Sequence, residues 1–437
     1  MNALTDGQPP KPTPTERTPS SRLMSLDALR GFDMFWIIGA DALVATLNQM
    51  SHSAPTSFLA HQLTHAGWEG FRFYDLIFPL FIFIVGVSLA FSLSKTLQQA
   101  GRTAAVKRLV RRSLLLFVAG LIYSNGFTLA WPDIRLMGVL NRIALVYFCV
   151  GLLFCFLKPR TLVAVGIALL TGYWALMTFV PVRNIQLTKE NLATLAAQAG
   201  DSETAALFRE RGNPSRNPEG PVWTAATRMF YATTERVTGR YDRGLNLSDH
   251  LDFQYLPGRK YDNFFDPEGY LSTLPALVTG LFGVFAGRLL ANRATRDQRK
   301  MVLLVSFGIG GIALGWLWHL QFPVIKKIWT SSFVLVAGGY SAVLLAAFYW
   351  IVDVRRCQRW CQPFVWMGMN SITIYLASKL IGWFSESAWG LIGENAHAWL
   401  EQNIAQGLGQ LLTTLTSLLL AFGLVYWLYR RRIFLRF

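Results

Sequence analysis

Long apolar stretches separated by short polar turns make up most of the chain. A helix needs roughly 20 mostly apolar residues to cross a bilayer, and about ten such stretches follow one another here. The pattern predicts an all-α polytopic membrane protein, with about ten transmembrane helices and one long extracytoplasmic loop. The predicted spans cover residues 27–49, 73–93, 113–131, 138–157, 161–181, 270–290, 301–320, 330–352, 364–384 and 408–429.

Polar segments divide the chain into four parts. Residues 1–22 are polar and rich in proline, lack the apolar core of a cleaved signal peptide, and predict a disordered cytoplasmic tail. Residues 23–181 hold the first half of the predicted helices and the loop with the main catalytic candidate, and residues 269–437 hold the second half. Between them, residues 182–268 form a long hydrophilic segment, which is either a covering loop or a lid over a site that opens to the same side.

Basic residues gather in alternate turns. Of the 437 residues, 52% are hydrophobic and 15% are charged, and the formal net charge is +16. Lys and Arg cluster after the second, fourth, sixth and eighth predicted spans, so the positive-inside rule places both termini in the cytoplasm and residues 182–268 outside it. Orientation in a membrane thus explains the charge, and we expect no nucleic-acid partner, which would need basic residues on one soluble face.

Cysteine and histidine positions do not predict a metal site. The four cysteines lie within one predicted span or at the cytoplasmic edge of another, where no oxidising compartment would pair them, and they lack zinc spacing. His61 and His65 are four residues apart, but the Glu of the zinc-binding H-E-x-x-H pattern is missing. We therefore expect no bound metal.

The first predicted span carries charged side chains, which are costly inside a bilayer and usually face a protein-lined cavity. Arg30 lies one turn from both Asp27 and Asp33, so these three residues can neutralise one another. Asp41 has no such partner within a turn. It therefore requires a partner on another helix or contact with water.

His65 precedes the second span, and Asp75 lies one to two turns inside that span. A carboxylate near an imidazole fixes the tautomer of the ring and raises its basicity, as general-base catalysis on an amine requires. Trp68 lies between them and is a candidate for substrate binding. The alternative is that His65 is an interfacial residue hydrated by water.

Further polar residues occur at the ends of later spans. Arg135, Asn141 and Arg142 lie near the outer end of the fourth span, where ion pairing and substrate anchoring are equally compatible with the pattern. Asn370 lies early in the ninth span, where a hydrogen bond between helices is the favoured interpretation and substrate binding the alternative.

Two motifs have simple structural interpretations. Asp266-Pro267-Glu268 has the composition of a helix start, with Asp266 as N-cap and Glu268 in the first turn, and capping is favoured over substrate binding. Residues 308–313 match a dinucleotide-binding fingerprint by letter, but they lie within a predicted span without a strand before them. Small residues that pack helices closely explain this motif better.

The motifs together resemble the heparan-α-glucosaminide N-acetyltransferase family and its shorter bacterial relatives. They occur in the order of the family and extend over nearly the whole membrane portion. The matching stretches are Ser25-Leu26-Asp27-Ala28-Leu29-Arg30-Gly31, His65 through Trp68 to Gly70, Asp75-Leu76-Ile77-Phe78-Pro79, Arg135-Leu136-Met137-Gly138-Val139-Leu140-Asn141-Arg142, Asp266-Pro267-Glu268-Gly269, Gly368-Met369-Asn370-Ser371 and Tyr429-Arg430-Arg431-Arg432-Ile433-Phe434.

The resemblance implies transfer of an acetyl group from cytoplasmic acetyl-CoA to the amino group of an amino sugar or glycan on the opposite side of a bacterial inner membrane. It also implies that His65 is the essential histidine and Asp75 the membrane aspartate. Asp41 stands where the animal enzyme has an active-site asparagine, so the acceptor can differ. By this resemblance we expect the chain to lack the lumenal domain and first span that precede this region in the animal enzyme.

The candidate site therefore combines His65 as base, Asp75 as the residue that orients it, and Asp41 or Asn141 near the acceptor. A covalent acetyl-histidine is the alternative route. The candidates for substrate binding are Trp68, Asn141, Arg142, Asp266, Glu268 and Asn370.

Two other functional classes compete with the enzyme. A transporter or flippase for a small anionic or sugar-linked solute would also place Asp and Arg in the membrane, but the sequence has no obvious internal repeat. A membrane sensor or scaffold would use the long outer segment to bind a partner. The sequence leaves the oligomeric state open, with a homodimer as one candidate.

Overall fold

The computed structural model describes residues 23–51, 53–125, 133–210, 220–392, 399–400 and 402–434. Within them the regular secondary structure is almost entirely helical, and β1 (Val182–Arg183) and β2 (Arg236–Val237) form a short antiparallel pair. The predicted all-α class is confirmed. The helices are α1 (Met24–Phe35), η1 (Trp36–Ala40), α2 (Asp41–Ser51), α3 (Ala54–Gln62), α4 (Phe73–Asn125), α5 (Val139–Phe156), α6 (Pro159–Phe179), α7 (Lys189–Gln198), α8 (Ser202–Arg209), α9 (Pro221–Ala232), α10 (Leu247–Tyr255), α11 (Thr273–Ala291), α12 (Asp297–His319), α13 (Ser331–Phe348), η3 (Tyr349–Val354), α14 (Gln362–Met369), α15 (Ser371–Ile392) and α17 (Leu408–Arg430).

Seven helices in the described part of the chain are long and apolar enough to cross a membrane. They are α4, α5, α6, α11, α12, α13 with η3, and α17. The 53-residue α4 contains the predicted span 73–93 and residues 113–125 of the next one, because the chain turns at Gly101, whose φ of 77° is left-handed. All predicted spans overlap these helices or the shorter α1, α2, α14 and α15, in agreement with a polytopic membrane protein.

Small residues let the membrane helices approach closely. A Cβ added to Gly31 in α1 would lie 1.7 Å from the carbonyl oxygen of Phe364 in α14. A Cβ on Gly308 in α12 would lie 2.8 Å from the carbonyl oxygen of Gly339 in α13. The glycines of residues 308–313 therefore include a helix-packing position, as the sequence predicted.

The first predicted span is broken. Gly39 has a φ of 124° within η1, between α1 and α2. Arg30 pairs with Asp27 at 3.6 Å, as predicted, and donates a hydrogen bond to Ser88. Asp33 does not join this pair: it is buried, and its carboxylate oxygens have no hydrogen-bond partner among the described residues.

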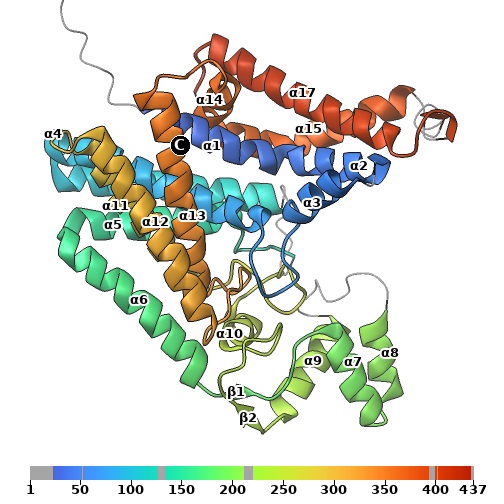
Figure 1. Cartoon of the computed structure of the whole chain (residues 1–437). Helices are drawn as coiled ribbons and strands as arrows, with labels where there is room; N and C mark the ends of the chain where they lie inside the picture. The colour runs from blue at the N-terminus through green and yellow to red at the C-terminus, as the bar shows by residue number, and fades with distance from the viewer. Residues whose placement is uncertain are drawn as a thin grey trace, which may run out of the picture.

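Residues 182–268 have a core of their own. In Figure 1 the green α7, α8 and α9 gather at the end of the molecule away from α14 and α17. Aromatic rings fill the interior, with Trp223 stacked on Phe253 at 4.8 Å and Phe264 against both. This segment is therefore a small folded unit, and its last residues, 256–268, lead back to the membrane helices beside the candidate site.

Candidate active site

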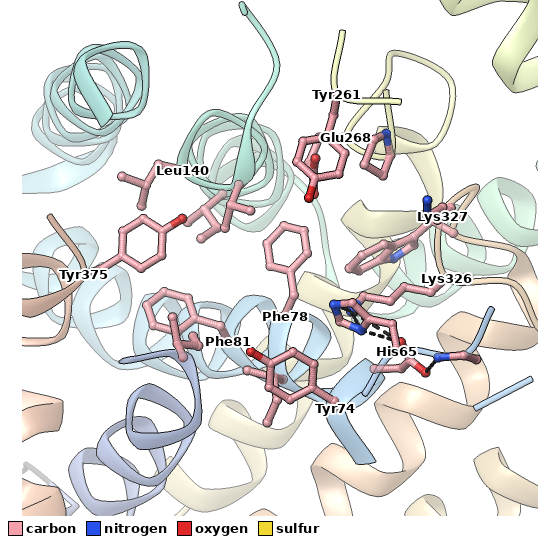
Figure 2. Close-up of a pocket in the computed structure, with 18 of the residues that line it drawn as sticks. His65, Tyr74, Phe78, Phe81, Leu140, Tyr261, Glu268, Lys326, Lys327 and Tyr375 are labelled. Carbon is pink, nitrogen blue, oxygen red and sulfur yellow. Dashed lines mark hydrogen bonds and ion pairs between the residues drawn. The ribbon is translucent and has the colours of Figure 1, made fainter. Parts of the chain in front are cut away.

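A cavity of about 310 Å³ opens where the loop before α4 meets the loops before α5, α11 and α13. Its inner wall is apolar and includes Ile37, Phe78 and Leu140. Its polar lining residues are His65, Trp68, Tyr74, Asp75, Arg135, Tyr261, Glu268, Lys326, Lys327 and Tyr375. Figure 2 shows His65 and Lys326 side by side, with Tyr261 and Glu268 on another wall. An apolar cavity with a few convergent polar groups has the form of a small-molecule site.

Asp75 holds the loop that carries His65. It is the third residue of α4, and its Oδ2 accepts hydrogen bonds from the backbone N–H groups of Ala66 and Arg72, both at 3.1 Å. The bond to Arg72 is the return half of a capping box, in which a carboxylate in the first turn binds the N–H before the helix. The start of the helix thereby fixes the loop against it.

The other oxygen of Asp75 faces the imidazole of His65. Asp75 Oδ1 lies 2.9 Å from His65 Nδ1, so the buried carboxylate accepts the Nδ1 proton and leaves the Nε2 lone pair available. The backbone oxygen of His65 accepts a bond from Arg72, and the ring packs on Tyr74 with centroids 4.8 Å apart. The side chain of His65 is 53% exposed, which suits a group that receives a proton from a ligand.

Lys326, which no sequence motif indicated, completes this corner. Its Nζ lies 3.0 Å from His65 Nδ1 and 3.5 Å from Asp75 Oδ1. Burial lowers the pKa of Lys326 to about 8, against the attraction of Asp75 and Glu268. One signal was available in the sequence: Lys326 and Lys327 stand in a predicted outer turn, where the positive-inside rule leaves basic residues unexplained.

A second charged cluster lines the cavity at Arg135. Its guanidinium binds both oxygens of Asp266, at 2.8 and 2.7 Å, and Glu268 Oε2 at 2.6 Å. The ring of Tyr261 lies 5.0 Å from the guanidinium carbon. Burial raises the pKa of Glu268, and the charge of Arg135 opposes this rise.

This cluster corrects the capping interpretation. The helix α11 begins at Thr273 and its N-cap is Ser272, so Asp266 is not the cap. Asp266 and Glu268 lie in the turn before the helix, where the pull of the buried guanidinium outweighs the local preference for capping. Glu268 also reaches the cavity, whereas Asp266 does not line it.

Asn141 and Arg142 lie behind the cavity. Both are fully buried and neither lines it. Asn141 donates to the carbonyl oxygen of Phe117 at 2.9 Å. Arg142 donates to the carbonyl oxygen of Pro267 at 2.9 Å and to Ser272, so it supports the turn that carries Glu268.

The remaining candidates are spread out. Trp68 lines the cavity, and its indole N–H donates to the carbonyl oxygen of Tyr241 at 2.8 Å. Asp41 does not line it but interacts with the hydroxyl of Tyr74, which does. This is the partner on another helix that the sequence required. Asn370 is buried at the junction of α14 and α15, outside the cavity lining.

The fold and cavity define a multi-helix membrane protein with a histidine–carboxylate pair in a partly apolar pocket. The family model "Heparan-alpha-glucosaminide N-acetyltransferase, catalytic" matches residues 22–197, which include His65 and Asp75. Two proteins named heparan-alpha-glucosaminide N-acetyltransferase are similar to the chain. The mouse protein is 28% identical over 361 residues (76% of this chain, 51% of the relative), and the human protein is 27% identical over 405 residues (85% and 55%).

These findings confirm the resemblance that the ordered motifs indicated. The chain spans about half the length of the curated relatives it matches. Glu268 and Lys326 lie beyond the range of the family model, so their presence in the pocket comes from the structure alone.

Proposed function

We propose that the chain is a transmembrane N-acetyltransferase, which moves an acetyl group from cytoplasmic acetyl-CoA to the amino group of an extracytoplasmic amino sugar or glycan. The contact of 2.9 Å between His65 Nδ1 and Asp75 Oδ1, at a cavity with an apolar inner wall, is the observation that carries this proposal. The names of the similar proteins support the reaction class.

In this proposal His65 acts through Nε2. The carboxylate of Asp75 holds the Nδ1–H tautomer, so Nε2 accepts the proton as the acceptor amine attacks the thioester carbonyl. The imidazolium then protonates the departing thiolate of CoA. In the covalent route the same nitrogen first takes the acetyl group and passes it to the amine.

The proposed orientation follows the charge pattern. Both termini and the basic turns face the cytoplasm of a bacterial inner membrane, and the unit of residues 182–268 lies outside. Trp68, Tyr261 and Glu268 line the cavity near that unit and contact the acceptor. The apolar inner wall surrounds the acetylated arm of acetyl-CoA, which enters from the cytoplasmic side.

Purified full-length protein in lipid nanodiscs tests the proposal. With acetyl-CoA and glucosamine, the protein should release free thiol, and His65→Ala should abolish the release. His61→Ala is a matched control, because His61 is an exposed histidine on α3 outside the cavity lining and its loss should leave the rate unchanged.

Other results would replace the proposal. Thiol release that depends on the acceptor but survives His65→Ala would remove the catalytic role of this residue. Solute uptake into vesicles without consumption of acetyl-CoA would indicate the transporter. Intact-mass analysis without acceptor separates the two chemical routes, since only the covalent route adds an acetyl group to His65.

A further inference from the structure

Lys326 lies over the face of the His65 ring. Its Nζ is 3.0 Å from Nδ1 and 3.5 Å from Nε2. If the ammonium lay in the plane of the ring and pointed at Nδ1, it would be much farther than 3.5 Å from Nε2, because the two nitrogens point away from each other. Asp75 therefore keeps the in-plane position at Nδ1, and the ammonium lies over the ring, closer to Nδ1 but still 3.5 Å from Nε2, the nitrogen that acts in the proposed function.

The other lining cations are held by carboxylates. Arg135 makes two short bonds to Asp266 and a third to Glu268, and Lys327 pairs with Asp262. Lys326 instead lies 3.5 Å from Asp75, whose oxygen has its shorter contact, 2.9 Å, with His65. An ammonium has three N–H donors, and one loose carboxylate contact does not saturate them.

The turn that carries Lys326 is fixed to the His65 loop. Ile325 bridges to Glu69, and the N–H of Gly70 donates to the carbonyl oxygen of Val324 at 2.8 Å. Trp329 has a φ of 51° although it is a bulky, fully buried residue. A conformation of this kind is strained for a bulky residue, and it persists where the surrounding structure fixes it, often at functional sites.

We infer that Lys326 is the group that binds the carbonyl oxygen of the acyl donor and stabilises the oxyanion formed during acyl transfer. This role rests on the proposed acetyltransferase function and adds the electrophilic half of the site. A carbonyl carbon close to His65 Nε2 places its oxygen within reach of an ammonium that is 3.5 Å from the same nitrogen.

The chemistry balances with acetyl-CoA and an amine. The nitrogen of the acceptor forms a bond to the carbonyl carbon, and the π electrons move to the oxygen, which Lys326 then holds as an oxyanion. His65 takes the amine proton. When the oxyanion collapses, the carbon–sulfur bond breaks and the thiolate of CoA receives that proton. In the covalent route Lys326 serves both acyl-transfer steps in the same way.

Lys326→Met removes the ammonium while keeping an unbranched stem of nearly the same length, and Lys326→Arg keeps the charge. Loss of one oxyanion donor lowers kcat by roughly 10²- to 10³-fold, so we expect that loss in Lys326→Met and recovery of at least about tenfold in Lys326→Arg. Lys189→Met, at the start of α7 and outside the cavity lining, should match the wild type.

Binding to two CoA derivatives separates this role from a structural one. Acetyl-CoA has the carbonyl, and the S-ethyl thioether of CoA has a methylene in its place. Calorimetry should show that Lys326→Met weakens acetyl-CoA binding selectively, with the Kd of the thioether changed by less than about twofold, because only one ligand offers an oxygen to the ammonium.

Either of two results would overturn the inference: a kcat of Lys326→Met within about threefold of wild type, or equal weakening of both ligands. Absence of acetyl transfer in the wild type would instead reject the proposed function. If Lys326→Met does not fold, Lys326→Arg carries the test. A folded Lys326→Arg protein with no activity above His65→Ala would also overturn the inference.

Discussion

Two charged clusters line the same cavity and differ in how their charges are satisfied. Arg135 donates three short hydrogen bonds, of 2.6 to 2.8 Å. Two go to the oxygens of Asp266 and one goes to Glu268. At Asp75, one carboxylate oxygen serves both an imidazole at 2.9 Å and an ammonium at 3.5 Å. We call the first the saturated cluster, because both oxygens of Asp266 accept hydrogen bonds from Arg135 and from backbone N–H groups, and the second the unsaturated cluster, because the ammonium of Lys326 keeps donors for a ligand.

The difference indicates that the cluster at Arg135 stabilises the fold, whereas the cluster at Asp75 acts on the substrate. Asp266 also accepts backbone N–H bonds from Tyr261 and Glu268, so every part of its carboxylate holds the outer turn in place. His65, by contrast, is 53% exposed and lines the cavity. Buried ion pairs whose hydrogen bonds are all made are costly to break, whereas functional groups need donors or acceptors that are free to bind a ligand. Three predictions test this division.

The largest expected effect is on the unsaturated cluster. In Asp75→Asn the amide can donate to Nδ1 and favour the wrong tautomer of His65, so kcat should fall roughly 10³- to 10⁴-fold. Thiol release measures this loss. Asp201→Asn is the control, since Asp201 caps α8 and lies outside the cavity lining. A fall below about tenfold in Asp75→Asn would show that Asp75 does not set the tautomer.

Breaking the saturated cluster should act on stability. Arg135→Gln leaves two buried carboxylates without their cation, a loss of about 3 to 5 kcal/mol in the free energy of unfolding. Thermal unfolding in detergent measures it. The control is Arg240→Gln, because Arg240 and Asp242 form a pair at 3.1 Å that is about half exposed, and such surface pairs contribute about 0 to 1 kcal/mol. Equal stability of the two variants would remove the distinction between the clusters.

The smallest effect is a dependence on pH. Burial lowers the pKa of Lys326 to about 8, and the charge of Lys327 also lowers it. The charges of Asp75 and Glu268 act in the opposite direction and raise it. The charged form is lost as pH rises through this value, so activity should fall about tenfold per pH unit above it. Lys326→Arg should lose this alkaline limb, since a guanidinium stays charged. An unchanged limb in that variant would assign it to another group.

Local patterns were sufficient for the fold class. The apolar stretches determined where membrane helices form, because transfer of each segment into a bilayer depends mainly on its own residues. The spacing of His65 and Asp75 also indicated their pairing, since the capping bonds of Asp75 to Ala66 and Arg72 are short-range. Pairing of Arg30 with Asp27, one turn away, was equally accessible.

Only the tertiary structure decided the partners from distant loops. Lys326 is separated from His65 by 261 positions, and Arg135 from Asp266 by 131. Asp266 has the sequence of an N-cap, yet it binds a guanidinium, because a buried charge takes the strongest available partner and local preference contributes less. Chain composition determined which segments enter the membrane, whereas helix packing determined which charges meet at their outer ends.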